Sequence, residues 1–155
     1  MTIEERLAKA FGAEVVASDP MTVGFGLTGL RVTLADGRVL AIKARQSVSH
    51  ADLRLEGYML GELARQSELP VPRVYLAEPD LLAMDYLEND GGPITPNVER
   101  HAAELIAALH ATPCAFFGYE RDTLIGPLPQ PNSRSEKWIP FIREPRLLAM
   151  ADDPN

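Results

Sequence analysis

Cysteine is almost absent from this sequence, and long apolar runs are missing altogether. Cys114 is the single thiol, so the chain cannot form an internal disulfide, which fits a reducing compartment. We expect Cys114 to be a buried structural residue. Residues 1–6 are polar and acidic, unlike a secretion signal, and no apolar run approaches the length of a membrane span. We therefore expect a cytoplasmic protein with no membrane partner.

Basic residues are scarce relative to acidic ones. The chain of 155 residues has 15 Lys and Arg against 22 Asp and Glu, a net charge of −7. Nucleic acids and anionic membranes bind basic faces, and none is evident, so we exclude both as main partners. A site for a small anionic ligand would have to be locally positive. We predict no metal site, because His101 and His110 lack acidic or cysteine partners at ligand spacing.

The N-terminal part has the pattern of a helix followed by an antiparallel sheet. A capping box at Thr2 predicts a short helix that stops at Gly12. Residues 21–44 alternate as strands do, and Asp36-Gly37 is a strong hairpin signal among them. Counting a strand before Gly24, we expect three antiparallel strands.

Later segments alternate between extended and helical patterns. Residues 74–76 and 81–84 are extended, and a helix starts at Thr95-Pro96 and ends near Pro113. Beyond that proline we expect irregular structure that packs onto a helical lobe, with a further helix barely begun at 146–150.

A glycine-rich turn is the first motif that carries chemistry. Gly24-Phe25-Gly26-Leu27-Thr28-Gly29 fits the pattern GxGxxG, which serves dinucleotide folds, kinases and ordinary turns. In a dinucleotide fold the third glycine begins a helix, whereas here the residues after Gly29 lead into the hairpin. A strand–turn–strand arrangement fits the kinase use, in which backbone N–H groups approach phosphates. A hairpin that needs glycine only for steric reasons remains the alternative.

Lys43 closes the strand-like run Leu40-Ala41-Ile42-Lys43, one hairpin after the glycine turn, as a lysine does in kinases. A strand lysine fits ATP because the phosphates need a point cation held at fixed depth. The alternative is that Lys43 is only a solvated surface charge.

Glu56 is the expected partner of that lysine. Apolar spacing predicts a helix over residues 49–66 with Ser49 as its cap, and it places Glu56 within a leucine stripe. A carboxylate there is costly to desolvate unless a cation meets it, and Lys43 is the cation at hand. The alternative is that Glu56 lies at the helix edge and pairs with Arg65 or Lys9.

The segment Met84-Asp85-Tyr86-Leu87-Glu88, followed by Gly91-Gly92, looks like a kinase hinge, in which backbone groups bind adenine. The order of glycine turn, Lys43, Glu56 and hinge resembles the aminoglycoside-phosphotransferase branch of kinase-like folds. Downstream segments resemble the fructosamine (ketosamine) kinase family, and the resemblance covers essentially the whole chain. These segments are Phe117-Gly118-Tyr119, Ile125-Gly126, Leu128-Pro129-Gln130-Pro131-Asn132, Trp138-Ile139-Pro140-Phe141 and Arg143-Glu144-Pro145-Arg146-Leu147.

The resemblance implies an α+β protein-kinase-like fold. Residues 1–88 would form an N-lobe with an antiparallel sheet, one αC-type helix and the hinge, and residues 89–155 a linker and an incomplete helical C-lobe. It also implies an ATP-dependent phosphotransferase that uses Mg²⁺ and phosphorylates a sugar hydroxyl of ketosamines. The residues implied in nucleotide binding are Gly24, Gly26, Thr28, Lys43, Glu56, Asp85, Tyr86 and Leu87.

Members of the family continue with a His-Gly-Asp loop that carries the catalytic base, and then with residues that bind magnesium. No His-Gly-Asp occurs in this sequence. We therefore expect no catalytic or Mg²⁺-binding residue, and an N-terminal portion of such an enzyme that transfers phosphate poorly. Three alternatives stay open: a non-catalytic nucleotide-binding module, a related phosphotransferase acting on aminoglycosides, choline or homoserine, and a Rossmann-type NAD protein. The exact substrate and the oligomeric state do not follow from the sequence.

Overall fold

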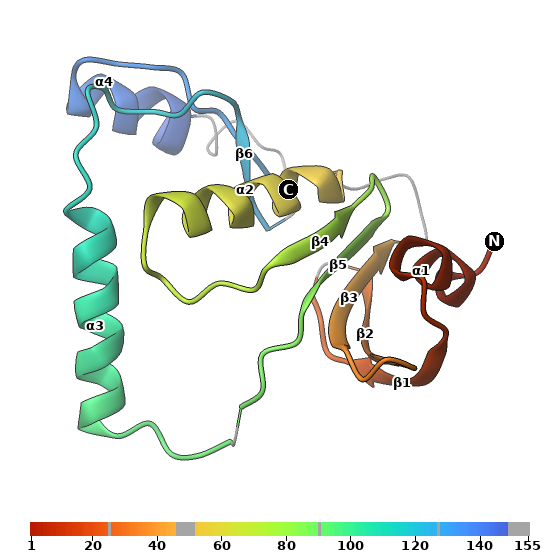
Figure 1. The fold of residues 1–155 in the computed structure, drawn as a ribbon. Helices are drawn as coiled ribbons and strands as arrows, with labels where there is room; N and C mark the ends of the chain where they lie inside the picture. The colour runs from red at the N-terminus through yellow and green to blue at the C-terminus, as the bar shows by residue number, and fades with distance from the viewer. Residues whose placement is uncertain (25, 46–51, 90, 127, 149–155) are drawn as a thin grey trace.

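A five-stranded antiparallel sheet is the larger of the two sheets in the described residues, as a computed structural model shows (Figure 1). The structure describes residues 1–24, 26–45, 52–89, 91–126 and 128–148. The helices are α1 (Ile3–Phe11), α2 (Leu53–Gln66), α3 (Pro96–His110) and α4 (Trp138–Ile142), and a π-helix, η1 (Arg143–Leu148), follows. The strands are β1 (Val15–Met21), β2 (Leu27–Leu34), β3 (Val39–Arg45), β4 (Val74–Ala77), β5 (Leu81–Asp85), β6 (Thr123–Ile125) and β7 (Leu128–Gln130).

Helix α1 begins and ends as its sequence predicts. The Thr2 hydroxyl accepts from the Glu5 N–H at 3.2 Å, and the Glu5 carboxylate accepts from the Thr2 N–H at 2.9 Å. Such a capping box satisfies two N–H groups that the helix leaves unpaired, and a cap of this kind contributes about 1 kcal/mol. At the other end Gly12 has φ 66°, a left-handed conformation that favours glycine.

The five strands have the order β1-β2-β3-β5-β4. The hairpin predicted at Asp36-Gly37 joins β2 to β3, and Gly37 has φ 88°. The three expected strands are present, but β1 begins at Val15, earlier than the alternation over 21–44 indicated. Its residues Ser18-Asp19-Pro20 are exposed at the sheet edge, where polar side chains and a proline without an N–H are tolerated.

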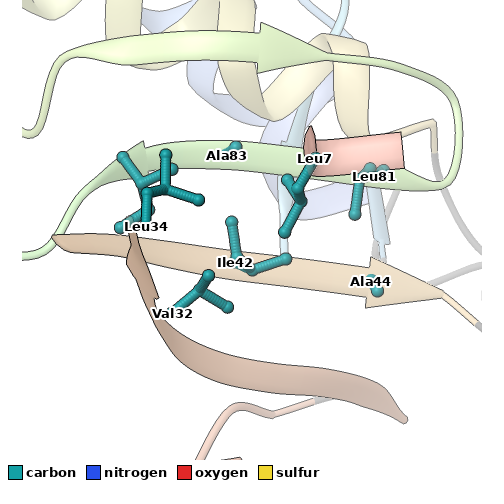
Figure 2. Packing of buried hydrophobic residues seen from close by; sticks show 8 residues of the cluster. Leu7, Val32, Leu34, Ile42, Ala44, Leu81 and Ala83 are labelled. Carbon is teal, nitrogen blue, oxygen red and sulfur yellow. The ribbon is translucent and has the colours of Figure 1, made fainter. Parts of the chain in front are cut away.

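The main core lies between α1 and one face of the sheet. Figure 2 shows Leu7 of α1 pointing toward apolar side chains of β2, β3 and β5. Leu7 and Leu81 are completely buried. The cluster consists of Leu7, Val32, Leu34, Leu40, Ile42, Ala44, Leu81 and Ala83. Because side chains alternate along a strand, the neighbours of these residues, Lys43 included, belong to the other face.

Helix α2 covers that other face, where Leu53 and Gly57 are its buried residues. A Cβ built on Gly57 would lie 2.8 Å from the Cβ of Ala77, so the helix and β4 are in close contact. The helix starts later than predicted. Asp52 is its N-cap, accepting the Arg54 N–H at 2.9 Å, and Ser49, the expected cap, lies outside the described residues.

Helix α3 is the predicted helix after the linker, with Thr95 as N-cap and Pro96 in its first turn. It ends at His110 and has no buried residue, and Figure 1 shows it standing apart from the sheet. None of the helices in the described part of the chain has the length and apolar character needed to cross a membrane.

The segment after α3 is more ordered than expected. It contains the β6–β7 hairpin and α4, whose Pro140 is the third helical residue, where its missing N–H breaks no helical bond. Besides the packing onto the helical lobe that we expected, which stays a prediction, β6 contacts α2. Cys114 is exposed in the loop that follows α3, so the prediction of a buried thiol was wrong.

Candidate functional site

Lys43 and Glu56 meet on the α2 side of the sheet. Lys43 comes from the central strand β3, paired with Gly29 of β2 on one side and Leu82 of β5 on the other. Its ammonium donates to the Glu56 carboxylate across the gap between sheet and helix. This confirms the pairing predicted from the sequence.

The alternative partners of Glu56 are not used. Arg65 pairs with Glu62, three residues before it on the same helix. The Lys43 and Glu56 side chains are 26% and 28% exposed, so the pair is partly solvated, not buried as the leucine stripe suggested. A pair of this exposure contributes about 1 kcal/mol or less to stability, so its main effect is to fix where the ammonium sits.

The glycine turn joins β1 to β2, which excludes the dinucleotide arrangement in which Gly29 would begin a helix. Gly26 has φ 69°, and the Leu27 N–H donates to the Gly24 carbonyl at 3.4 Å. A Cβ on Gly24 would meet nothing within 4 Å, so the fold itself does not require a glycine there. Open space above a glycine leaves room for a ligand to approach the backbone.

Thr28 and Gly29 occupy successive positions of β2 and therefore opposite faces. Thr28 pairs with Ala44, a member of the core on the α1 side, whereas Gly29 pairs with Lys43. The register therefore does not bring the Thr28 side chain to the face that carries Lys43. Gly29 has a steric reason to be glycine, because a Cβ there would lie 2.7 Å from the Met21 carbonyl oxygen.

The hinge residues leave β5 beside β4. Both oxygens of the Asp85 carboxylate are engaged, accepting the Tyr75 hydroxyl at 2.7 Å and the Arg73 N–H at 3.1 Å. The Tyr86 N–H donates to the Val39 carbonyl at 3.4 Å. Within the described part of the chain the Leu87 N–H has no backbone acceptor, and the Leu87 side chain is 54% exposed. Of the three predicted hinge residues, Leu87 is thus the one with a backbone donor to offer.

Arg31 of β2 contacts the hinge, and the sequence did not predict this contact. Its guanidinium lies 4.9 Å from the centre of the Tyr86 ring and donates to Glu88 at 3.4 Å. Arg31 shares the Lys43 face of the sheet, because its cross-strand partner Ala41 lies two residues before Lys43. The only signal available in the sequence was the strand alternation, which does not reveal a contact with a segment 57 residues away.

Across the described ranges no group of three His, Cys, Asp or Glu side chains lies close enough to hold an ion. His101 and His110 are exposed on α3. The Mg²⁺ implied by the family resemblance thus finds no set of protein ligands in this part of the molecule.

A second side of α2 is held by residues 117–135. The Tyr58 hydroxyl donates to Glu120 at 2.5 Å, and the Arg121 guanidinium lies 4.0 Å from the centre of the Tyr58 ring. One turn further on, the Tyr119 hydroxyl donates to Glu62 at 3.0 Å. A pocket of about 330 Å³ lies between α2, the end of α3 and this segment, beside the direct contact of β6 with α2.

These polar bonds shift the proton affinities of the groups that make them. Desolvation, then the bond to Glu120, raises the pKa of Tyr58 above its ordinary value. Hydrogen bonds from Arg65, then from Gln66 and Tyr119, lower the pKa of Glu62 from 4.5 to about 2. Both shifts favour the protonation states found near neutral pH, a neutral phenol and a carboxylate.

Asn132 fixes the segment internally and is the one buried polar residue of the described chain, at 5% exposure. Its amide donates to the Thr123 hydroxyl at 2.7 Å and to the Arg121 carbonyl at 3.1 Å. The Arg146 guanidinium donates to the side-chain oxygen of Asn132 at 2.5 Å. Asn132 thus has a structural role, and the Gln130 side chain accepts from the Thr123 hydroxyl at 3.0 Å.

Comparison with known proteins gives consistent results. A family model described as fructosamine kinase matches residues 1–152. A curated Synechocystis protein named "Probable ketoamine kinase" is 27% identical over 152 residues, which cover 94% of this chain and 51% of that protein. A crystal structure from Thermobifida fusca, named "putative fructosamine-3-kinase", is 31% identical with a TM-score of 0.81, covering 96% of this chain and 52% of that one.

A second crystal structure, from Haemophilus somnus, is 24% identical with a TM-score of 0.77 and covers 94% of this chain and 51% of that chain, so it supports the fold. The chain spans about half the length of the relatives that it matches.

Proposed function

The chain belongs to the fructosamine kinase family, and from that premise we propose that it is the nucleotide-binding part of an ATP-dependent ketosamine kinase. In this proposal residues 1–88 form the N-lobe with its hinge and residues 89–155 begin the helical lobe of a protein-kinase-like fold. The single observation that carries the proposal is the ion pair between Lys43 and Glu56 on the α2 side of the sheet. The reaction would place a phosphoryl group on a sugar hydroxyl of a glycated amine in the cytoplasm.

Lys43 would bind the ATP phosphates. Phosphoryl transfer depends on positioning and on neutralising phosphate charge, and an ammonium in a central strand is held at fixed depth. Glu56 would keep that ammonium from swinging into solvent. Its partial exposure supports this role, because a fully buried pair would leave no path for an anionic ligand to reach Lys43.

The glycine turn would cover the phosphates. Gly24 supports this because nothing in the described residues occupies the space where a side chain would stand. Gly26, in a left-handed conformation, turns the backbone at the same place. Thr28 is the second residue of β2 to pair with β3, and its side chain belongs to the face opposite Lys43.

The hinge would bind adenine through its backbone. Leu87 offers an N–H that has no backbone acceptor within the described residues, whereas the N–H groups of Asp85 and Tyr86 are bonded to Arg73 and Val39. Asp85 and Tyr86 would then hold the strand that presents Leu87. The contact of Arg31 with the Tyr86 ring keeps a positive charge on this side of the sheet.

Catalysis would need groups that these residues do not supply. The described residues offer no ligand set for a protein-bound Mg²⁺. We expect the chain to bind ATP and to transfer phosphate slowly by itself, since the His-Gly-Asp loop of the family does not occur in its sequence.

Calorimetric titration with MgATP tests the proposal. We expect saturable binding by the wild type, at least about tenfold weaker binding by Lys43→Ala, and an intermediate loss for Glu56→Gln, which keeps the shape but removes the charge. Lys9→Ala, a change at an exposed lysine of α1, is the matched control and should bind as the wild type does. Equal binding by Lys43→Ala and Lys9→Ala would overturn the proposal.

A phosphorylation assay distinguishes a ketosamine kinase from the alternative functions. The chain, alone and extended through its genomic reading frame, is incubated with ATP and a ketosamine, with choline and an aminoglycoside as alternative acceptors. Turnover of the ketosamine by the extended chain supports the proposal. ATP binding without turnover by either form would favour a non-catalytic nucleotide-binding module.

A further inference from the structure

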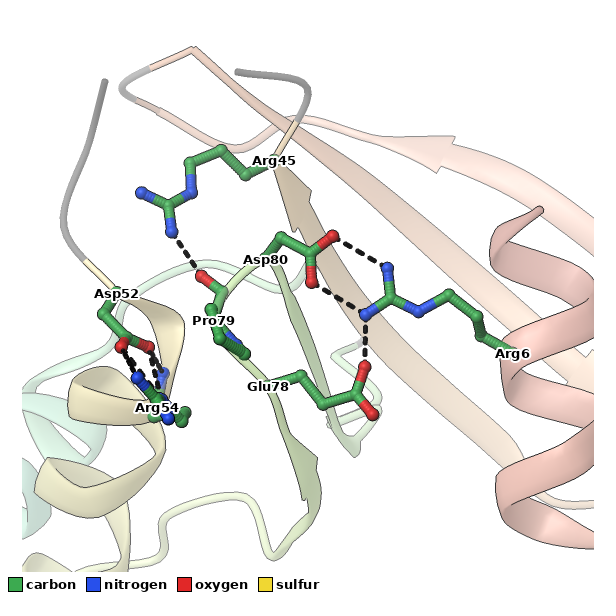
Figure 3. Close-up of polar contacts among 7 residues, drawn as sticks. All are labelled: Arg6, Arg45, Asp52, Arg54, Glu78, Pro79 and Asp80. Atoms are coloured by element: carbon green, nitrogen blue, oxygen red, sulfur yellow. Dashed lines mark hydrogen bonds and ion pairs between the residues drawn. The ribbon is translucent and has the colours of Figure 1, made fainter. Parts of the chain in front are cut away.

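The turn between β4 and β5, residues 78–80, touches three other elements (Figure 3). The Pro79 carbonyl accepts the N–H of Leu53, the first residue of α2, at 3.1 Å. The Asp80 carbonyl accepts the N–H of Arg45, the last residue of β3, at 3.0 Å. The Arg45 guanidinium adds a second bond to Pro79. The turn therefore binds the end of one element and the start of another through its own backbone.

Those two ends lie close to the proposed nucleotide site. Arg45 is two residues beyond Lys43 along β3, about 7 Å at the rise of a strand. Leu53 is three residues before Glu56 along α2, about 4.5 Å at the rise of a helix. A displacement of the turn would thus move both Lys43 and Glu56, because a short, regular piece of backbone connects each of them to the turn.

Arg6 of α1 holds the turn from the other side. Its guanidinium makes a two-pronged contact with the Asp80 carboxylate, at 2.8 and 2.7 Å, and also bonds Glu78 (Figure 3). The Arg6 side chain is 19% exposed, and the next residue, Leu7, is completely buried in the core, so the base of this side chain is fixed. The bond from Arg6 is the main cause that lowers the pKa of Asp80.

We propose that Arg6 is a positioning residue for the nucleotide site. By holding the 78–80 turn, it sets where β3 ends and where α2 begins, and so the spacing of Lys43 and Glu56. A planar guanidinium suits this task because its paired donors fix orientation as well as distance. The inference rests on the proposed function, since it concerns the residues that would bind ATP.

Arg38 provides a matched control. Its guanidinium also contacts a carboxylate of a β-turn, Asp36, at 2.8 Å, and a backbone carbonyl of α1, that of Phe11, at 2.9 Å. It lies before the start of β3, at the hairpin with β2, and has no contact with α2 or with the 78–80 turn among the residues described. Replacing Arg38 thus removes a comparable set of hydrogen bonds at a place far from Lys43 and Glu56.

The experiment measures MgATP binding by calorimetry and thermal unfolding for the 155-residue chain, the wild type and four variants. The variants are Arg6→Gln, Arg38→Gln, Lys43→Ala and the double variant Arg6→Gln/Lys43→Ala. We expect both arginine variants to unfold at lower temperature but only Arg6→Gln to weaken MgATP binding, by about fivefold, a typical coupling between neighbouring groups. Once Lys43 is absent, the Arg6 change should weaken binding no further.

The outcomes separate the two proposals. Unchanged MgATP binding by Arg6→Gln, or equal weakening by Arg38→Gln, would overturn the role of Arg6 while leaving ATP binding in place. No saturable binding by the wild type would overturn the proposed function and the inference with it. If Arg6→Gln does not fold, Arg6→Lys serves instead: it keeps the charge but loses the two-pronged contact, and wild-type affinity in that variant would overturn the inference.

Discussion

Gly57→Ala should move α2 relative to the sheet and change both stability and nucleotide binding. A Cβ at this position would lie 2.8 Å from the Ala77 Cβ and 3.2 Å from Leu82 Cδ1. Carbon atoms pack at about 3.5–4.0 Å, so the helix must shift by about 1 Å at the residue next to Glu56. The Ala77 Cβ cannot rotate away, because it is attached directly to the backbone of β4.

The expected change in the free energy of unfolding is the balance of two opposing effects. Overpacking a tight contact costs about 1–3 kcal/mol, whereas replacing a helical glycine by alanine favours the helix by about 1 kcal/mol. We expect a net loss of about 1 kcal/mol in the free energy of unfolding. We also expect weaker MgATP binding, because the shift changes the distance between Glu56 and Lys43.

Gly61→Ala is the control, on the same helix and four residues further on. Nothing lies within 4 Å of a Cβ built there, so only the helix propensity changes, and the free energy of unfolding should rise by about 0.5–1 kcal/mol. Urea denaturation of the two variants and the wild type measures both effects. The reasoning is refuted if Gly57→Ala proves as stable as Gly61→Ala, or if the two bind MgATP equally well.

Two further predictions concern the segment that packs against α2. Asn132→Ala should lower the free energy of unfolding by about 1–3 kcal/mol, because it removes the bonds of the buried Asn132 amide to the Arg121 carbonyl and the Thr123 hydroxyl and one of the bonds of the Arg146 guanidinium. Asn97→Ala, at an exposed position of α3, should change it by less than about 0.5 kcal/mol in the same urea titration. Acid should weaken the contact of Glu62: its folded pKa of about 2 lies below the ordinary 4.5, so its stabilising effect is complete above 4.5 and is lost as the pH falls toward 2. The stability difference between the wild type and Glu62→Gln should therefore shrink from about pH 6 to about pH 3, and a difference that grows would contradict this reasoning.

Features that depend on neighbouring residues could be predicted from the sequence. The capping box at Thr2 and the turn at Asp36-Gly37 are local, because their hydrogen bonds join residues that are close in the chain. The Lys43–Glu56 pair spans only 13 residues, and the helical period placed Glu56 on the side of the sheet. The pattern also gave the correct type to β4, β5 and α3.

Features that depend on distant residues could not be predicted. Arg6 and Asp80 are 74 residues apart, and nothing in the local pattern of either indicates the other. The β6–β7 hairpin was missed because Pro129 and its short strands resemble irregular structure, and their stability comes from contacts with α2. The exposure of Cys114 depends on how α3 ends and what packs there, which composition does not reveal.

The two edge strands of the sheet protect it from joining other sheets. An edge strand exposes unpaired N–H and C=O groups that can recruit a strand from another chain, which is the first step of aggregation. In β1 and in β4 the register shifts near the start of the strand, and such irregularities bend and twist the edge. Pro20 in β1 has no N–H to donate, and Asp19 beside it adds an exposed charge. A foreign strand would therefore find an interrupted template at either edge.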